Sequence, residues 1–401
     1  MSGMPDTASL QLAWLADRFR AQAALGLHYR PDDADRARFH QLRRHAAELL
    51  ACVDSRDVDL IEATFSKDDG LSTPLAAIAF WVTSADDVHL RRVAYLPPNQ
   101  PLPHALTKAA TRLQADTTPT RPVALVDSHE LGLPDPHTHI AVYRVDSTLQ
   151  ASAIVEAWPE PATALQRALG QYQLDETRGP RVDAGTDPVP VNAEAKAICD
   201  RIAELAASGQ EHSSDRYNVE RFAQLRALAE NTVVEDITYQ PFESYELNPD
   251  GATTGAEVAI FDTNNRMLLV QRADTGQWAI PGGGCEVGES WAATAAREVR
   301  EEIGLRIEDA IDGLVGVVDN RVITSEPTTI PVIAIFQATL RTSDLDFTLS
   351  SEIRDVAWVT EEQLSRLDLF AGHRAKITAA FGYRSNAGRR PRDAAAAVSH
   401  G

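Results

Sequence analysis

The sequence predicts a mixed α/β protein that contains two successive copies of one plan, a helical hairpin followed by a mixed β-sheet between helices. Three observations support this fold class. The chain has 401 residues, which is enough for two domains of ordinary size. Two stretches repeat one another at a fixed offset. Strand-like and helix-like runs then follow each of these stretches in the same order.

The helical hairpin occurs twice. Residues 15–48 and 198–231 each place apolar side chains at helical spacing on either side of a predicted glycine turn. They align without a gap at an offset of 183 (198 − 15 = 183), and 12 of the 34 aligned positions are identical. The identical residues include Gly26 with Gly209 and Phe39 with Phe222. Because helical periodicity does not require matched glycines, we interpret the repeat as an old duplication; two unrelated hairpins with convergent patterning are the alternative.

Each hairpin is followed by apolar runs that predict strands, and a helix follows the second strand. In the first half we expect strands at 76–82, 88–94, 123–126 and 139–145, with a helix near 103–114. In the second half we expect strands at 257–261, 267–271, 314–318, 332–340 and 353–359, a helix that begins after Ser290 and ends at Gly304, and a short helix near Glu361. The matching landmarks, in order, are Pro97 with Pro281, Val126-Asp127 with Val318-Asp319, and Ala157-Trp158 with Ala357-Trp358.

Composition shifts suggest where the parts begin and end. Residues 171–192 are rich in Gly, Pro and Asp, which is typical of a linker, and residues 383–401 are small, basic and aperiodic, which predicts a disordered tail. The expected division is a helical hairpin at 10–52, a sheet domain at 53–170, the linker at 171–192, a second hairpin at 193–235, a second sheet domain at 250–382 and the tail at 383–401.

The charge balance argues against two classes of partner. With 38 basic and 58 acidic residues the formal net charge is −20, which disfavours binding to duplex nucleic acid or to a membrane surface. No run reaches the roughly 18 apolar residues of a membrane span, and the N-terminus has no secretory pattern. The scattered cysteines Cys52, Cys199 and Cys285 predict free thiols in a reducing compartment. We therefore expect a cytoplasmic protein without nucleic-acid or membrane partners.

Residues 283–305, GGCEVGESWAATAAREVREEIGL, carry the clearest chemical signal. On the predicted helix Glu298, Glu301 and Glu302 have i, i+3 and i+4 spacing, so their carboxylates share one face. They lie in the last turn, where the helix dipole disfavours negative charge by roughly 0.3–1 kcal/mol per group. A hard divalent cation with oxygen ligands explains this pattern better than a solvated acidic helix end, in which lysines would be interleaved.

The same segment matches the signature of Nudix hydrolases, G-x5-E-x7-R-E-U-x-E-E-x-G-U with U a bulky aliphatic residue, at every constrained position. The preceding stretch, LLVQRADTGQWAIPGG, is similar to the approach to this motif in that family. The resemblance implies the Nudix sandwich fold and a hydrolase of phosphoric anhydride bonds, with Mg²⁺ as cofactor and Mn²⁺ as a substitute. The hairpins resemble a segment found before Nudix enzymes that act on X-linked nucleoside diphosphates, in which it supports dimerisation.

The resemblance also implies site residues. The catalytic residues carried over are Glu298, Arg297 and Glu289, of which Arg297 orients the ligand carboxylates and Glu289 supports them. The implied metal ligands are Glu298, Glu301, Glu302 and a backbone carbonyl of Gly282 or Gly283. The expected substrate-binding residues are Arg272, Trp278 and Gly284. Glycines in this loop allow its backbone to approach the metal and the diphosphate closely.

The general base and the substrate stay open at this point. Glu298 is the first candidate for the group that takes the proton of the attacking water, and Glu326 and Glu352 are the alternatives. About 15–17 residues past the motif, ADP-ribose enzymes of the family carry a proline and dinucleoside polyphosphate enzymes a tyrosine. This chain has Asn320, Arg321 and Val322 there. Neither the nucleobase nor the X group can therefore be named.

The first half lacks the motif. An alignment of 94–116 with 279–301, extended by one residue, matches Arg112 with Arg297 and Asp116 with Glu301, but places Pro98 at Gly283, His104 at Glu289, Leu113 at Glu298 and Thr117 at Glu302. One carboxylate cannot assemble the metal site, so this half resembles a Nudix domain without its catalytic residues; an unrelated α+β domain is the alternative. Because hairpin and domain each occur twice, we expect an intramolecular pseudo-dimer and a monomeric protein.

Three functions are consistent with these patterns. The first is a Mg²⁺-dependent pyrophosphohydrolase with a small-molecule nucleotide substrate of the ADP-ribose, CDP-choline or nucleotide-sugar type. The second is a sensor that binds a nucleotide sugar without turnover, which the intact glutamates disfavour. The third is a hydrolase of damaged nucleoside triphosphates or of capped RNA, and the acidic charge disfavours long RNA.

Overall fold

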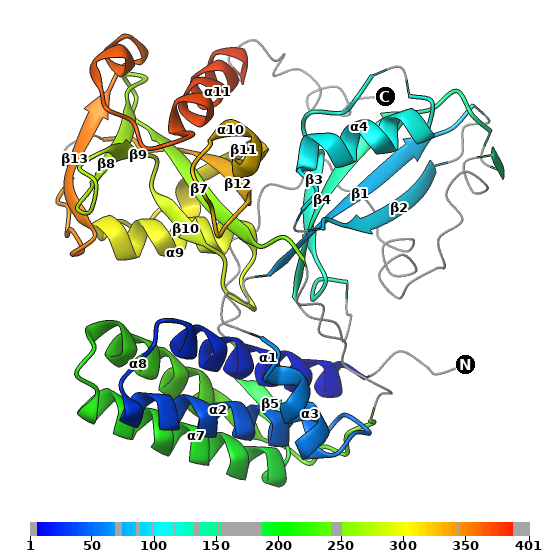
Figure 1. Ribbon diagram of the computed structural model, residues 1–401, viewed down its shortest axis with the longest axis vertical. Helices are drawn as coiled ribbons and strands as arrows, with labels where there is room; N and C mark the ends of the chain where they lie inside the picture. The colour runs from blue at the N-terminus through cyan, green and yellow to red at the C-terminus, as the bar shows by residue number, and fades with distance from the viewer. Residues whose placement is uncertain are drawn as a thin grey trace, which may run out of the picture.

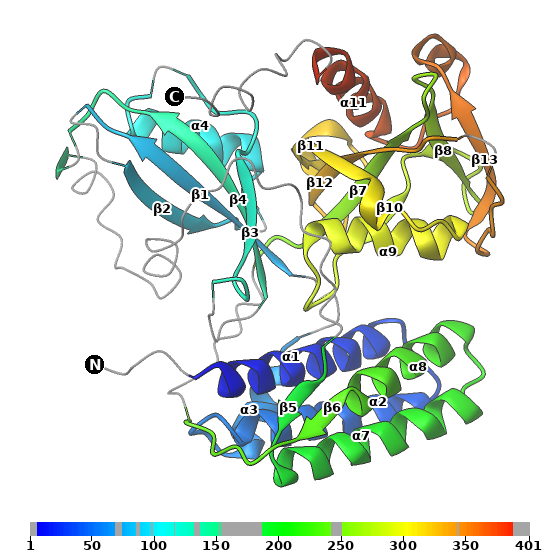
Figure 2. The same cartoon turned by 180° about the vertical axis from the view of Figure 1, so that it is seen from behind.

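The computed structural model describes residues 6–68, 74–85, 89–97, 99–115, 117–131, 137–150, 152–153, 187–241, 251–342 and 345–387. These residues form a helical bundle and two sheet units, which lie side by side on the same side of the bundle (Figures 1 and 2). None of the described helices is long and apolar enough to cross a membrane. The predicted linker, apart from residues 187–192, and the Ala157-Trp158 landmark lie outside the described residues.

Both hairpins contribute to one bundle with a common apolar core. Its helices are α1 (Thr7–His28), α2 (Asp33–Ala51), α3 (Val58–Phe65), α7 (Ala193–His212) and α8 (Arg216–Glu230). Each helix begins after an Asp or Asn whose side chain accepts a hydrogen bond from a backbone N–H of the first turn, which satisfies one of its free donors. Two short parallel strands, β5 (Val189–Val191) and β6 (Thr232–Val234), flank the second hairpin (Figure 2).

Equivalent residues of the two hairpins meet at the centre of the bundle. The rings of Phe39 and Phe222 stack with centroids 4.9 Å apart and an interplanar angle of 8°. Asn218 Nδ2 donates to Asp35 Oδ2 over 3.0 Å, and these two residues also differ by 183 in number (218 − 35 = 183). Contacts between equivalent positions are what a two-fold axis produces. The hairpins therefore pair about a pseudo-two-fold axis within one chain.

The matched glycines do not mark turns, so that prediction was wrong. Gly26 lies inside α1 and Gly209 inside α7. A Cβ at Gly26 would lie 2.4 Å from the Phe39 ring, and a Cβ at Gly209 would lie 2.4 Å from the Phe222 ring. Both glycines are needed because each phenylalanine ring packs directly on the helix backbone of its own hairpin.

The second sheet has the strand order β11-β12-β7-β8-β13, with β10 paired to β7 and β9 to β8. Its strands are β7 (Thr254–Phe261), β8 (Met267–Arg272), β9 (Trp278–Ala279), β10 (Gly282–Gly284), β11 (Ile311–Asp319), β12 (Val332–Thr339) and β13 (Ile353–Val359). The accompanying helices are α9 (Trp291–Ile303), η1 (Glu308–Ala310), α10 (Asn320–Ile323), η2 (Glu361–Arg366) and α11 (His373–Ala387).

The first sheet has the order β2-β1-β4-β3. Its elements are β1 (Leu75–Thr83), β2 (His89–Tyr95), α4 (Leu102–Arg112), β3 (Ala124–Asp127) and β4 (Thr138–Asp146). The central pair is parallel and the outer pairs are antiparallel, as in β8-β7-β12-β11 of the second sheet. In chain order β1 and β2 precede α4, whereas β7 and β8 are followed by the short strands β9 and β10 before α9. The four strands of the first sheet therefore have the same arrangement as four strands of the second.

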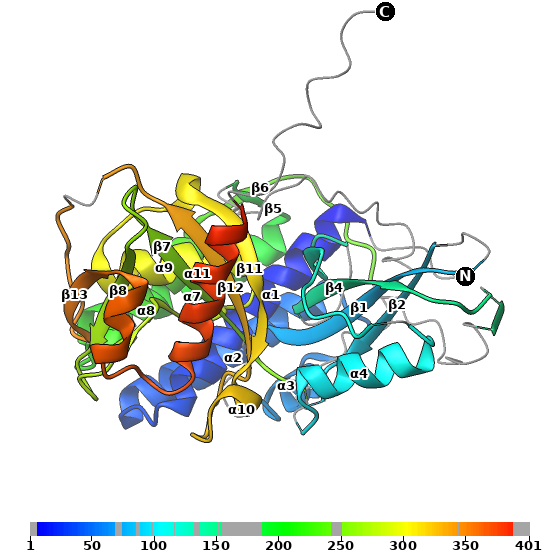
Figure 3. The same cartoon turned by 90° about the horizontal axis from the view of Figure 1, so that it is seen from above.

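The sheet units dock against each other. Ala76 donates its N–H to the Ala252 carbonyl over 2.8 Å, and Leu102, at the start of α4, donates to Asp319 Oδ2 over 2.6 Å. From above, α10 of the second unit lies beside α4 of the first (Figure 3). One buried apolar cluster contains side chains of both sheets. The two halves are therefore joined by a common apolar core and not only by the linker between them.

Two predicted features differ from the structure. Helix α11 continues to Ala387, so the tail expected at 383–401 begins with a helical turn, and the remainder lies outside the described residues. Helix α4 ends at Arg112 with Leu113 as its C-cap. The position aligned with Glu298 is therefore the C-cap of the helix, and Thr117, aligned with Glu302, lies beyond the helix end. Pro98 and Asp116 lie outside the described residues.

Candidate active site

Helix α9 carries the glutamates and has well-defined ends. The Ser290 side chain accepts from the N–H of Ala293, and Gly304 closes the helix in the left-handed region at φ 77°. Both ends agree with the sequence prediction. The apolar side of the helix, which includes Val299 and Ile303, is buried against the second sheet. The opposite side, with the carboxylates, is left facing the loop before the helix.

Arg297 joins the residues predicted from the motif. Its Nε donates to Glu289 Oε1 over 2.9 Å, and its Nη1 donates to Glu298 Oε1 over 2.9 Å and to Glu301 Oε2 over 3.1 Å. Its Nη2 donates to the Gly284 carbonyl over 2.8 Å. The guanidinium presents a fixed fork of donors, so these contacts define where two of the three α9 carboxylates lie.

The glycine strand β10 lies against the same carboxylates. A Cβ at Gly283 would come within 2.7 Å of Glu298 Oε1, so a larger residue there would displace that carboxylate. Gly282, at φ 147°, donates its N–H to Glu302 Oε2 over 3.3 Å. The structure thus brings Gly282 and Gly283 to Glu298 and Glu302, as the sequence predicted for a shared site.

The surroundings of Glu298 and Glu302 raise the pKa values of both carboxyl groups. Burial raises the pKa of Glu298 to about 7, the neighbouring Glu301 carboxylate adds to the shift, and Arg297 opposes it. Burial also raises the pKa of Glu302 well above its usual range, and the charge of Glu298 adds to it. Two adjacent carboxyls that share this property are typical of functional sites.

The donor set fits a divalent cation. Among the residues that the structure describes, no three His, Cys, Asp or Glu side chains converge on one point closely enough to hold an ion as they stand. Arg297 and the Gly282 N–H instead hold the three carboxylates of α9. Their oxygens, with the backbone of β10 beside them, are the ligands that Mg²⁺ and Mn²⁺ prefer. A bound cation would also offset the burial and the repulsion that raise the pKa values of Glu298 and Glu302.

Of the other predicted residues, Arg272 and Glu352 lie near Glu302. Both are close enough to change the pKa of that carboxyl. Arg272 also pairs with Asp274 and lies over the Phe370 ring, 4.6 Å from its centroid. Trp278 is partly buried beside the strand end, with its backbone bonded to Asp368 and Phe370. Glu326 is exposed, and none of the contacts described for it reaches the motif.

Residues 320–322 stand where related enzymes carry residues that mark the substrate, and here they make other contacts. Arg321 pairs with Asp319 over 2.6 Å and donates to the Gln100 carbonyl of the first half over 3.0 Å. Asn320 donates to the Ile330 carbonyl, and Val322 is exposed. The segment therefore helps to dock the two sheet units.

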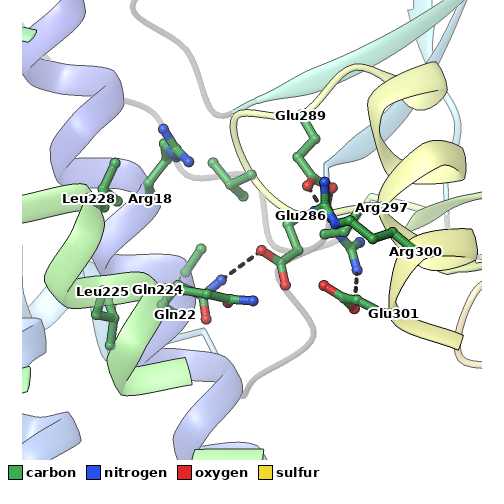
Figure 4. A pocket seen from close by; sticks show the side chains of 12 residues that line it. Arg18, Gln22, Gln224, Leu225, Leu228, Glu286, Glu289, Arg297, Arg300 and Glu301 are labelled. Carbon is green, nitrogen blue, oxygen red and sulfur yellow. Dashed lines mark hydrogen bonds and ion pairs between the residues drawn. The ribbon is translucent and has the colours of Figure 1, made fainter. Parts of the chain in front are cut away.

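A pocket of about 200 Å³ lies between the bundle and the motif (Figure 4). Its lining residues come from α1, from α8, and from the motif: Arg18, Ala21, Gln22, Gln224, Leu225, Leu228, Glu286, Val287, Glu289, Arg297, Arg300 and Glu301. Gln22 of α1 donates to Glu286 Oε2 over 2.9 Å. Both hairpins therefore form a wall beside Glu301, which neither a single hairpin nor an isolated sheet domain would supply.

Sequence reasoning missed two groups near this site. Lys376 of α11 is buried with Glu257, which is paired in register with Gly282, and its Nζ lies 2.5 Å from Glu257 Oε1. A glutamate inside the otherwise apolar strand TGAEVAIF was the available signal. The second group, His137 and His139 of the first half, contacts the loop before α9. His137 precedes β4 and His139 lies within it. Their role could not be recognised from the sequence, because it depends on contacts with the second half.

Helix α4, which occupies the place of α9 in the first unit, reads LPHALTKAATR and contains no carboxylate. Its buried residues are Leu102, Ala105, Leu106, Ala109 and Ala110. The same backbone element is therefore retained as a packing helix.

Comparisons with known proteins agree with this geometry. A family model described as the NUDIX domain matches residues 252–381, and one described as a UDP-X-like, N-terminal oligomerisation domain matches residues 11–65. Nucleoside triphosphatase NudI of Enterobacter sp. (strain 638) is 36% identical over 127 residues, which cover 30% of this chain and 90% of that protein. The putative ADP-ribose pyrophosphatase YjhB of Bacillus subtilis (strain 168) is 30% identical over 143 residues, which cover 32% of this chain and 69% of that protein.

Two solved structures are also similar. A UDP-X diphosphatase is 20% identical, with coverage of 48% of this chain and 94% of that chain and a TM-score of 0.37. The NUDIX domain of Shewanella oneidensis NrtR, complexed with ADP ribose, is 20% identical, with coverage of 33% and 89% and a TM-score of 0.29. At these scores the structural likenesses carry no argument about activity.

Proposed function

The chain belongs to the Nudix hydrolase family, and from that premise we propose that it is a Mg²⁺-dependent pyrophosphohydrolase of nucleoside diphosphates linked to another moiety. The observation that carries the proposal is the group of Glu298, Glu301 and Glu302 at the end of α9, where Arg297 holds two of them and β10 lies against the site. This group fits the chemistry of phosphoric anhydride cleavage, in which the protein mainly positions charge.

Glu298 and Glu302 would hold the cation together with a backbone carbonyl of Gly282 or Gly283, and Glu301 would join when a second ion binds. When bound, the cation supplies neutralisation of the diphosphate oxygens and a lower pKa for the attacking water. Arg297 keeps Glu298 and Glu301 in place, and Glu289 holds Arg297 from the other side. Water adds to one phosphorus, the bridging P–O bond breaks, and two phosphate monoesters leave.

A carboxylate takes the proton of the attacking water. We retain Glu298 as the proposed base, because Arg297 holds its carboxylate in the group that would bind the cation and its water. Glu352 is the stronger of the two alternatives, since it lies near Glu302 and is not part of the proposed ligand set. The pH profile of kcat in E352Q separates them: retention of the wild-type profile supports Glu298, and loss of its acidic limb assigns the base to Glu352.

The X-linked class is favoured by the wall that the hairpins add beside Glu301. A group linked beyond the diphosphate could lie against this surface. The match of residues 11–65 to a UDP-X-like domain points the same way. Nucleoside triphosphate hydrolysis is the second candidate, because the similarity to a nucleoside triphosphatase covers 90% of that protein.

A substrate panel tests the proposal. The full chain is incubated with Mg²⁺ and ADP-ribose, CDP-choline, nucleotide sugars or nucleoside triphosphates, and the products are identified. We expect a nucleoside monophosphate and a phosphorylated X group from at least one X-linked substrate. Release of pyrophosphate from triphosphates alone would favour the second candidate, and absence of any product would refute both.

We also propose that the protein is a monomer whose two halves replace a dimer. The Phe39–Phe222 and Asp35–Asn218 contacts support it, because they join equivalent positions within one chain. Light scattering at low micromolar concentration should give a mass near 43.7 kDa. A mass near twice that value would make the pairing of the hairpins intermolecular.

A further inference from the structure

We propose that His137 and His139 of the first half are positioning residues for the active site of the second half. They fix the loop before α9, and through it Glu289 and Arg297. The inference rests on the proposed function, and it assigns to the half without catalytic residues a defined part in metal binding.

Both histidines bond directly to the backbone of that loop. His137 Nδ1 accepts from the N–H of Gly288 over 3.0 Å, and His139 Nε2 donates to the Glu289 carbonyl over 2.8 Å. Both residues are buried. Gly288 has φ 93°, in the left-handed region, so this turn has a special conformation that the histidines hold in place.

The protonation states follow from the partners. A carbonyl can only accept, so Nε2 of His139 carries a proton, while its Nδ1 faces the Thr254 hydroxyl at 3.0 Å. Burial lowers the pKa of His139 to about 3, so this ring stays neutral at physiological pH. His137 uses Nδ1 as an acceptor, which leaves the proton on Nε2, 3.8 Å from Asp127 Oδ1.

A series of ring contacts, two stacked, one edge-to-face and one tilted, packs around the histidines. The series Trp14, His129, His137, His139 and Trp291 has successive ring centroids 4.5, 4.3, 4.8 and 4.6 Å apart. It runs from α1 of the bundle, through the first sheet unit, to the first residue of α9. Rings that pack in this way on three parts of the chain leave little freedom for the loop that they support.

From the loop the contacts continue to the proposed metal ligands. Glu289 Oε2 accepts from the Thr294 hydroxyl over 2.9 Å, and Glu289 Oε1 accepts from Arg297 Nε over 2.9 Å. Arg297 in turn contacts Glu298 and Glu301. A shift of the Glu289 backbone would therefore move the guanidinium that orients the ligand carboxylates. Partners of this kind outside the ligand set change metal affinity by roughly 10- to 100-fold.

Four variants of the full chain test the proposal. H137A and H139A remove the hydrogen bonds to the loop, whereas H137N keeps an acceptor near the Nδ1 position and H139Q keeps a donor near the Nε2 position. His104, exposed on α4 of the same half, provides the matched control H104A. The readouts are the Kd of Mn²⁺ by calorimetry, kcat on the substrate that the panel identifies, and the Tm.

We expect H137A and H139A to weaken Mn²⁺ binding about 10-fold, with kcat lowered at limiting Mg²⁺ and largely recovered at saturating Mg²⁺. H137N and H139Q should recover most of the affinity, and H104A should match the wild type. A loss of Tm with unchanged Mn²⁺ affinity in the folded alanine variants would overturn the proposal, because the histidines would then be structural only. Equal weakening in the alanine variants and in H137N and H139Q would overturn it as well.

The proposed function fails in a different way. A wild-type protein that cleaves nothing in the panel and binds no Mn²⁺ refutes that function and, with it, this inference. A wild-type protein that does both, with histidine variants that behave like it, refutes the positioning role alone.

Discussion

The four strands of the first sheet unit have the same order as β8, β7, β12 and β11 of the second, and the two units differ in the helices α4 and α9. Helix α9 ends in three glutamates, two of which have raised pKa values, whereas α4 has no carboxylate. The α4 unit nevertheless preserves the β2-β1-β4-β3 topology. The glutamates are therefore not required by the fold. They place like charges at an unfavourable helix end, where Arg297 offsets part of the repulsion and a bound cation would offset more.

The units also support each other unequally. The first half receives Asp319 at the start of α4, where Pro101 offers no side-chain cap of its own. The second half receives His137 and His139 at the loop before α9, although Ser290 already caps that helix. The contact to α4 replaces a missing cap, whereas the contact to α9 adds rigidity to a helix that is already complete.

The largest expected effect is on kcat/KM, when the glutamates that distinguish α9 from α4 are replaced. E298Q and E302Q should each reduce kcat/KM on the order of 1,000-fold, because each removes a charge that acts on the reacting diphosphate. The Tm without metal should be unchanged or higher, since like-charge repulsion is relieved. The control is E308Q, just beyond the same helix. Near wild-type rates in both variants at saturating Mg²⁺ would disprove the assignment.

The second prediction tests the equivalence of the hairpins. F39A and F222A should each lower the free energy of unfolding by about 3 kcal/mol, because each empties one half of the same stacked pair. Urea denaturation of both variants measures this. Y217A, at an exposed aromatic residue of α8, should change it by less than about 0.5 kcal/mol. Very unequal losses from the two phenylalanines would argue against the pseudo-two-fold arrangement.

The third prediction concerns pH. Protons compete with the cation for Glu298, whose pKa is raised to about 7. Below that pH, Mn²⁺ affinity should therefore fall, by up to about 10-fold per pH unit, and the raised pKa of Glu302 adds to the fall. Calorimetry between pH 5.5 and 8.5, in roughly half-unit steps, follows the change. If the E298Q variant loses the pH dependence of Mn²⁺ affinity, the dependence is due to Glu298. If the variant keeps an equally steep pH dependence, another group is responsible.

The sequence predicted the parts of the fold that local patterns encode. Strand β13, the capping of α9 by Ser290 and Gly304, and the repeated hairpins follow from periodicity and from residues with special backbone preferences. The role of Gly26 was misread, because a glycine beneath a ring and a glycine in a turn look alike without the partner Phe39. The motif glutamates could be predicted, because their spacing alone places them together on one helix.

What could not be predicted depends on contacts between distant segments. Arg321 stands where related enzymes carry a residue that marks the substrate. In this structure it bonds to Asp319 and to the carbonyl of Gln100 in the first half. His137 and His139 reach the loop before α9 only because the two sheet units dock. Such pairings arise from tertiary packing, which leaves no periodic pattern in a single sequence.

On the proposed function, one half of this chain carries out metal-dependent hydrolysis and the other half supports it. Titration of Mn²⁺ into the full chain and into the E298Q/E302Q double variant, followed by electron paramagnetic resonance, tests this division of roles. We expect binding at micromolar concentration in the wild type and no site tighter than about 1 mM in the double variant, since α4 offers no carboxylate. A site of wild-type affinity that persists in the double variant would contradict the account.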